Sequence, residues 1–210
     1  MLLHWPDCRN ARDLGGLPTA EGGALRERAL VRSDSLNRLT ADGVVALHAH
    51  GVSRIVDLRG IDEAAQFPSP LAGHEMVRLL PLVDPDDDPA RDLADLAPLA
   101  EVYRASVIGN GGRVAAVVAA VADAPPGAVL VHCAAGKDRT GIVVAVLLRL
   151  AGVPDEHIAA DYAFSGDCEA PTILAALARV DEVFGGVEPY LRANGVTGEQ
   201  LGAVRDRLVA

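Results

Sequence analysis

Aromatic residues and cysteines are scarce in this sequence. Only 3% of its 210 residues are aromatic, although half are hydrophobic, so alanine, valine and leucine must fill the core. A chain of this length buries a substantial core within one domain. The three cysteines, Cys8, Cys133 and Cys168, are odd in number, and their spacing fits neither a disulfide framework nor a zinc site. We therefore expect no metal and no other cofactor.

Long hydrophobic runs and an excess of basic residues are also missing. The longest apolar run is shorter than a membrane span, and the first residues lack the charged and apolar regions of a signal peptide. We therefore expect a cytoplasmic protein without stable membrane insertion, although export by a non-classical route would leave no such signal. The 29 acidic and 19 basic residues give a formal charge of −10, which disfavours nucleic acid as a partner.

One stretch of the chain carries a recognisable chemical pattern. Residues Val129–Gly141 spell Val-Leu-Val-His-Cys-Ala-Ala-Gly-Lys-Asp-Arg-Thr-Gly. The β-branched start predicts a short buried strand, and the apolar sequence from Thr140 onward predicts a buried helix that ends at Gly152 and Pro154. Cys133 therefore lies where a strand turns into a helix. Backbone N–H groups of such a loop, together with the free donors of the helix's first turn, attract anions.

The residue types in this loop suit phosphate chemistry. Its field favours a thiolate over a thiol, which makes Cys133 a nucleophile at neutral pH. Arg139 offers a planar guanidinium to two oxygens of a phosphate, and Thr140 is placed to donate its hydroxyl to the departing cysteine. We therefore predict two-step hydrolysis of a phosphate monoester through a phosphocysteine. The residues expected to surround the phosphate are Ala134, Ala135, Gly136, Lys137, Asp138 and Arg139.

The same residues resemble a known family. His132-Cys133, five further residues and Arg139-Thr140-Gly141 resemble the signature of the cysteine-dependent protein tyrosine phosphatases. The full string resembles the bacterial PtpB-type subgroup, whose members act on phosphotyrosine and sometimes on phosphoserine, phosphothreonine or phosphoinositides. The resemblance implies a single α/β domain over residues 1–210, with a mainly parallel central sheet flanked by helices. It also implies phosphorylated proteins or phosphoinositides as substrates, and phosphate or vanadate as active-site ligands.

The rest of the chain predicts the elements of such a domain. A hairpin is expected around residues 21–23, and residues 170–210 show only helical patterns, with Thr197 and Gln200 forming a capping box. Helix 40–50 is expected to begin after Thr40 and to stop at Gly51. Further helices are predicted at 92–107, 112–124, 155–164, 173–184 and from 197, and further strands at 52–59 and 76–82.

Other residues have either a site role or a structural one. Asp57 ends a predicted central strand, where α/β sites collect, and resembles a family position beside the loop; an ion-paired or capping role is the alternative. Tyr103 matches a family tyrosine near the pocket rim, whereas a lone aromatic on a helix is more often a core residue. His132 is a supporting residue by the same resemblance. For Arg12 and Asp13 we favour a structural ion-pair role.

The general acid has several candidates. Asp138 is the lead candidate, because the resemblance implies that a loop aspartate does this work where no Trp-Pro-Asp loop exists. The rivals lie in an acidic, proline-bounded loop and are Asp84, Asp86, Asp87 and Asp88. The tripeptide Trp5-Pro6-Asp7 spells the acid-bearing sequence of many relatives, but it lies far ahead of Cys133 and is interpreted as a coincidence.

Alternative functions also follow from the loop. Lys137 shares its position with a lysine of phosphoinositide phosphatases, but their second loop lysine is here Ala134, so phosphotyrosine is the main prediction and phosphoinositides the alternative. A sulfurtransferase also uses a loop cysteine but lacks the Cys-x5-Arg-Thr-Gly string. A non-catalytic phosphate-binding module would not need Cys133.

Whether Cys8 or Cys168 protects Cys133 through a disulfide is left open.

Overall fold

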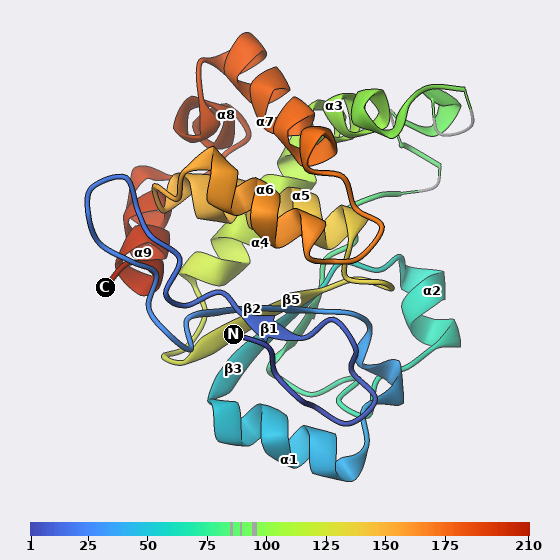
Figure 1. Ribbon diagram of the computed structural model, residues 1–210. Coiled ribbons are helices and arrows are strands. Elements are labelled where there is room, and N and C mark those ends of the chain that lie inside the picture. Colours follow the sequence, from blue (N-terminus) through green and yellow to red (C-terminus); the bar gives the residue numbers. More distant parts are fainter. Residues whose placement is uncertain (85, 89, 94–95) are drawn as a thin grey trace.

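A mainly parallel sheet forms the centre of the computed structural model, which describes residues 1–84, 86–88, 90–93 and 96–210 (Figure 1). Within these residues the strands run in the order β1-β2-β5-β3-β4. Only the pairing of β1 with β2 is antiparallel. The strands are β1 (Arg12–Asp13), β2 (Leu30–Ser33), β3 (Val52–Asp57), β4 (Val77–Leu79) and β5 (Ala128–His132). The predicted α/β class with a mainly parallel sheet is confirmed.

Helices cover both faces of this sheet in the ribbon view (Figure 1). One face carries α1 (Ala41–His50). The other carries α4 (Gly111–Ala122), α5 (Asp138–Leu150), α6 (Asp155–Ala163) and α9 (Gly198–Leu208). An outer layer over these helices consists of α3 (Leu99–Gly109), α7 (Ala170–Phe184) and α8 (Val187–Ala193), while α2 (Ile61–Gln66) follows β3.

The two apolar segments around the cysteine are the most deeply buried elements. Every residue of β5 is buried, because β2 and β3 flank it and helices cover both faces. In α5 the whole run from Ile142 to Leu148 is buried, so this helix has no exposed face along that stretch. A helix surrounded by others is apolar all round, which is why the sequence after the loop shows no polar stripe.

Predicted helix ends are confirmed where a side chain makes the cap. Thr40 Oγ1 accepts a hydrogen bond from the Gly43 N–H (3.2 Å), and Gly51 ends α1 with a φ of +89°. Thr197 and Gln200 form the expected capping box at α9, with reciprocal hydrogen bonds of 3.1 and 3.2 Å.

Several predicted boundaries are wrong. The helix expected from residue 92 begins at Leu99 instead, since Pro98 precedes it and a proline disfavours helical backbone in the residue before it. Residues 91–93 form a 3₁₀ turn, and positions 94–95 of the predicted helix lie outside the described residues. Helix α5 begins at Asp138, ahead of Thr140.

The glycine-rich C-terminal region contains a helix that the sequence did not predict. Helix α8 follows Gly185 and Gly186, and Pro189 lies in its first turn, where a missing N–H is tolerated. The predicted hairpin is reduced to an isolated bridge between Pro18 and Ala24, while β1 and β2 supply the antiparallel pair. Strands β3 and β4 are shorter than expected.

No single helix in the described ranges is both long and apolar enough to cross a membrane. Helices α3 and α4 pass that test only together, and they are bent by 70° at their junction.

Candidate active site

Cys133 lies at the carboxyl edge of the sheet. It directly follows β5, and α5 begins five residues later at Asp138, so the loop joins a buried strand to a buried helix as predicted. The side chain is only 2% exposed. In the sheet, Ser33 of β2 and Asp57 of β3 are both in register with His132, so the ends of three parallel strands meet beside the loop.

The carbonyl groups of the cysteine loop accept hydrogen bonds from residues that lie behind the loop. The Ser35 N–H donates to the carbonyl oxygen of Ala134 (2.8 Å), and Arg32 Nη2 donates to that of Gly136 (2.7 Å). The backbone N–H groups of residues 134–139, by contrast, make no hydrogen bond to any described residue. Because the carbonyls are already bound, the loop presents free N–H donors to an anion.

Gly136 and Asn10 fix the turn of this loop. Gly136 has a φ of +70°, and a Cβ atom there would lie 2.3 Å from the carbonyl oxygen of Ser33, so the position accepts only glycine. Asn10 Nδ2 donates to the carbonyl oxygens of Ala135 and Gly136, at 3.2 Å each. The N-terminal segment therefore supports the loop directly.

A buried ion cluster lies beneath the loop. Asp161 on α6 binds Arg32 Nη1 through one oxygen (2.6 Å) and Arg12 Nε through the other (2.7 Å). Both guanidinium groups are buried, and Arg32 is 1% exposed. Asp13 Oδ2 lies 2.9 Å from Nε2 of the buried His50, so Arg12 has the expected structural ion-pair role, and Asp13 contacts a histidine rather than Arg12.

Arg139 is oriented by an acid from another element. Its Nη1 and Nη2 donate to the two carboxylate oxygens of Glu63 on α2, at 2.7 and 3.1 Å. Burial by itself lowers the pKa of Arg139, but the Glu63 bonds and the nearby Cys133 outweigh it and raise the pKa, so the guanidinium stays charged. The hydrogen bonds from Arg139 lower the pKa of Glu63 in turn.

Asp138 has an exposed carboxyl group at the start of α5. Its Oδ1 accepts a hydrogen bond from the Tyr103 hydroxyl (2.6 Å), whose oxygen lies 2.7 Å from the Tyr162 hydroxyl. Burial and the bond to Asp138 raise the pKa of Tyr103, so it remains a donor. Tyr103 is thus both a buried residue and a contact of the predicted acid.

The rival acids have other contacts. Asp84 Oδ2 accepts from Arg113 on α4 (3.2 Å), and Asp88 Oδ1 accepts from a neighbouring backbone N–H. No hydrogen bond joins Asp84, Asp86, Asp87 or Asp88 to the cysteine loop in the described part of this segment, which leaves out Pro85 and Pro89.

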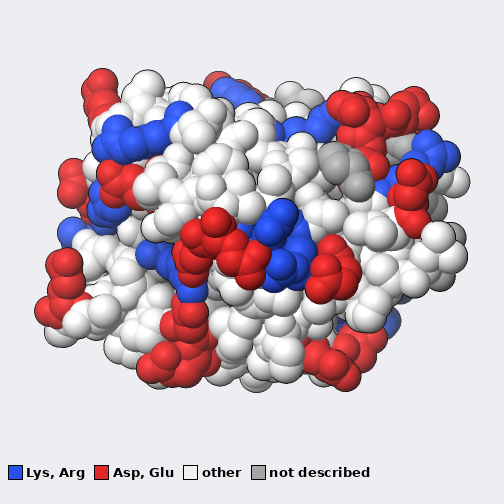
Figure 2. Space-filling view, turned by 90° about the horizontal axis from the view of Figure 1, so that it is seen from above, with Lys and Arg blue, Asp and Glu red and all other residues white. Residues whose placement is uncertain are grey.

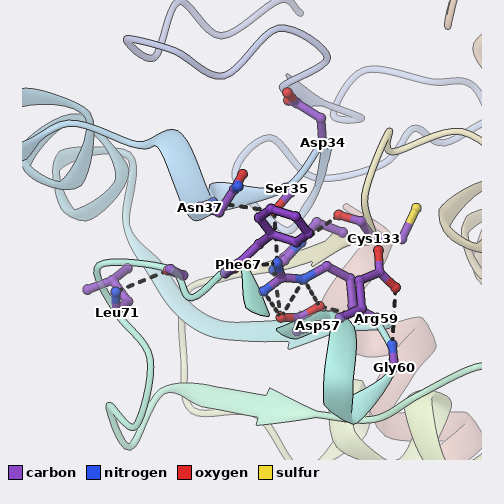
Figure 3. Close-up of polar contacts among 12 residues, drawn as sticks. Asp34, Ser35, Asn37, Asp57, Arg59, Gly60, Phe67, Leu71 and Cys133 are labelled. Carbon is purple, nitrogen blue, oxygen red and sulfur yellow. Dashed lines mark hydrogen bonds and ion pairs between the residues drawn. The ribbon is translucent and has the colours of Figure 1, made fainter. Parts of the chain in front are cut away.

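Asp57 faces an arginine rather than the loop opening. Arg59 donates to it from Nε (2.9 Å) and Nη2 (2.7 Å), and also reaches Ser35 Oγ (3.1 Å) and the Phe67 carbonyl (2.8 Å). Figure 3 shows these groups converging on Arg59, with the Cys133 sulfur pointing away from them. Burial raises the pKa of Asp57, but the bonds from Arg59 more than offset it and hold it below its usual range. Asp57 therefore has the ion-paired role that the sequence analysis gave as the alternative.

His132 is a buried neighbour of this pair. Its Nδ1 lies 3.1 Å from the Cys133 carbonyl oxygen and its Nε2 lies 3.7 Å from Asp57 Oδ2. Burial lowers the pKa of His132, which favours the neutral ring.

Comparison with known proteins agrees with this geometry. A model of the tyrosine phosphatase family matches residues 3–210. The chain belongs to the tyrosine phosphatase family. A tyrosine-protein phosphatase of Nostoc commune is 31% identical over an alignment of 228 positions, covering 91% of this chain and 78% of the relative. The triple specificity protein phosphatase PtpB of Mycobacterium tuberculosis is 34% identical over 194 residues, covering 77% and 68%. The predicted cysteine-dependent phosphatase of PtpB type is confirmed.

One detail of this phosphatase differs from the sequence-based expectations, and the structure also describes the cysteine pairing that the sequence left open. Thr140 is the third residue of α5 rather than its start; its buried Oγ1 has no partner among the described residues, so the predicted bond to Cys133 is not formed. Cys8 donates to Asp34 (3.1 Å), and burial raises its pKa. All three cysteines are free thiols, so no disulfide protects Cys133 here.

The sequence analysis missed the residues that hold the phosphatase loop in place, namely Asn10, Arg32, Ser35, Glu63 and Asp161. A weak signal was present for Arg32, a charged residue within the buried strand β2. No local pattern marks Glu63, whereas Asp161 lies in the stretch 160–165, whose sequence resembles the family without indicating a role for this residue. Within the described chain, no group of three or more His, Cys, Asp or Glu residues is arranged to hold a metal ion.

Proposed function

We propose that this chain hydrolyses phosphotyrosine in proteins, with phosphoserine and phosphothreonine as further substrates, through a phosphocysteine on Cys133. The observation that carries this proposal is the loop of free N–H groups between Cys133 and Arg139, whose carbonyls are bound from behind. An anion the size of a phosphate fits such a set of donors, and the guanidinium of Arg139 adds charge-assisted bonds.

The proposed reaction has two steps. In the first, the Cys133 thiolate attacks phosphorus; an S–P bond forms, the P–O bond to the leaving group breaks, and its electron pair goes to the leaving oxygen, which takes a proton from Asp138. In the second, the Asp138 carboxylate takes a proton from a water molecule that attacks phosphorus. The S–P bond breaks, orthophosphate departs and the thiolate is restored.

The distribution of charge on the molecule favours a protein substrate over a substrate embedded in an anionic bilayer. On the face that carries α3 and α7, acidic and basic side chains lie next to one another (Figure 2). Arg104 there pairs with Glu182 (2.9 Å), which also pairs with Arg179 (3.1 Å). With a formal charge of −10, docking on an anionic bilayer is disfavoured. We propose short-chain, soluble phosphoinositides as slower substrates, on the basis of Lys137, and a cytoplasmic location.

The test is steady-state hydrolysis of para-nitrophenyl phosphate and of a phosphotyrosine peptide, with and without vanadate and with EDTA. We expect inhibition by vanadate and no effect of EDTA. Cys133→Ser should abolish turnover while retaining phosphate binding, because an unactivated hydroxyl lacks the nucleophilicity of a thiolate. Arg139→Lys should be nearly as damaging, since an ammonium cannot replace a bidentate guanidinium. A Cys133→Ser rate above about one hundredth of wild type would exclude the covalent mechanism.

A further inference from the structure

Lys137 is the loop's exposed cation, and an acid outside the loop neutralises it. Its Nζ forms an ion pair with Oδ1 of Asp167, and the two side chains are 32% and 82% exposed. The hydrogen bond from Lys137 lowers the pKa of Asp167, and the same bond raises the pKa of Lys137. Asp167 follows Gly166, whose φ of +93° turns the chain between α6 and α7.

Both cationic side chains of the loop therefore already have a carboxylate partner. Arg139 is held by Glu63 and Lys137 by Asp167, and Asp138 adds a further acid at the opening. A substrate with one phosphate needs only the backbone N–H groups and Arg139. A second phosphate next to the first adds negative charge near the carboxylates of Glu63 and Asp167, and its nearest cationic partner in the loop must first leave Asp167.

The two ion pairs differ in how readily they exchange. Glu63 binds both Nη atoms of Arg139 in a partly buried bidentate contact, which leaves Arg139 Nε free for a phosphate oxygen. Asp167 makes a single contact to Lys137 at the exposed rim, where water and salt screen the attraction. The Lys137 side chain can therefore move from Asp167 to a competing phosphate.

We propose that Asp167 is a specificity-determining residue, which disfavours inositol rings with two neighbouring phosphates by competing with the second phosphate for Lys137. This inference rests on the proposed function and names the residue that sets its preference for monoesters with a single phosphate. It predicts that removing the Asp167 charge raises kcat/KM for bisphosphate substrates relative to monophosphate substrates, and that this increase requires Lys137.

The experiment compares kcat/KM for para-nitrophenyl phosphate with kcat/KM for dioctanoyl phosphatidylinositol 3,4-bisphosphate. Asp167→Asn should raise the bisphosphate-to-monophosphate ratio about two- to fivefold, the size expected for an exposed ion pair. Asp167→Glu keeps the charge and should restore the wild-type ratio. Glu156→Gln is the matched control, because Glu156 is an exposed acid on α6 with no ion pair in the described chain.

Lys137→Ala should lower the bisphosphate rate more than the monophosphate rate. Adding Asp167→Asn to Lys137→Ala should then produce no further change in the ratio. The inference is overturned if Asp167→Asn changes the bisphosphate and monophosphate rates by the same factor. It is also overturned if Asp167→Asn still raises the ratio in the Lys137→Ala background. If wild-type protein hydrolyses neither substrate, the proposed function itself fails, and that result is distinguishable from an unchanged ratio in an active enzyme.

Discussion

Asp138 is the residue on which protonation of the leaving group depends. Its carboxyl group is exposed at the loop, and the Tyr103 hydroxyl occupies Oδ1 at 2.6 Å, which leaves Oδ2 without a partner among the described residues. A general acid must lie within hydrogen-bond reach of the oxygen that it protonates. In the described structure Asp138 lies in the cysteine loop itself, at the start of α5, whereas Asp84 pairs with Arg113 on α4.

We predict that Asp138→Asn costs about a hundredfold or more in kcat for substrates with poor leaving groups, and much less for aryl phosphates whose leaving group needs no proton. The measurement is kcat for a series of phosphate monoesters of increasing leaving-group pKa. Equal losses along the series would indicate a structural role for Asp138 and would favour the acids at 84–88. Tyr103→Phe keeps the ring and removes only the hydrogen bond to Asp138 Oδ1. It should also lower kcat more for poor leaving groups than for good ones, but by a smaller factor than Asp138→Asn does.

Helix α6 holds the loop through one side chain. Asp161 lies between Arg12 of β1 and Arg32 of β2, and Arg32 in turn donates to the Gly136 carbonyl. The helix thereby connects the sheet to the back of the phosphate-binding turn. The charges are buried, so removing the acid would leave two guanidinium groups without a compensating carboxylate.

We predict that Asp161→Asn lowers the free energy of unfolding by about 3–5 kcal/mol, the usual cost of breaking a buried ion pair. Asp155→Asn, on the same helix, removes a half-exposed partner of Arg149 and should cost no more than about 1 kcal/mol. Urea unfolding followed by circular dichroism measures both. Similar costs for the two variants would show that the Asp161 cluster contributes no more than a surface pair. The active fraction of Asp161→Asn should also bind vanadate more weakly, because the Gly136 carbonyl loses its fixed donor.

The free energy of unfolding depends on pH through the buried imidazole of His132. His132 is 1% exposed, and burial lowers its pKa in the folded protein below the unfolded value of about 6.5. Between these two values the unfolded chain binds a proton that the folded chain does not. Stability is therefore fully present above about pH 6.5 and is lost as the pH falls toward the lowered folded pKa.

We predict that the urea midpoint of the wild-type domain falls as the pH is lowered below about 6.5, and that His132→Gln flattens this dependence. His48→Gln, at an exposed position of α1, should keep the wild-type slope. The depressed pKa of Asp57 acts only below about pH 3.9, outside this range. An unchanged slope in His132→Gln would assign the acid sensitivity to other groups.

The sequence by itself determined the chemistry of the loop and the elements on either side of it. Cys133, Arg139 and the apolar runs before and after them lie within a few residues of one another, so their strand–loop–helix arrangement depends on local preferences. Caps at Thr40 and Thr197 were predictable for the same reason. Boundaries were wrong where the local effect of a proline or glycine was not applied, as at Pro98 before α3 and at Gly185 and Gly186 before α8.

Only the tertiary structure decided which partners hold the loop's charges and carbonyls. Glu63, Arg32 and Asp161 come from segments that are distant in sequence, and the order β2-β5-β3 brings the ends of their elements to one edge of the sheet. An acid or arginine gives no local sign of its partner, because an ion pair depends on distance in space and on burial rather than on neighbouring residues. The loop's reactive residues can therefore be identified in the sequence, while the partners of its charges and carbonyls depend on how α2, α6 and the strand ends pack around it.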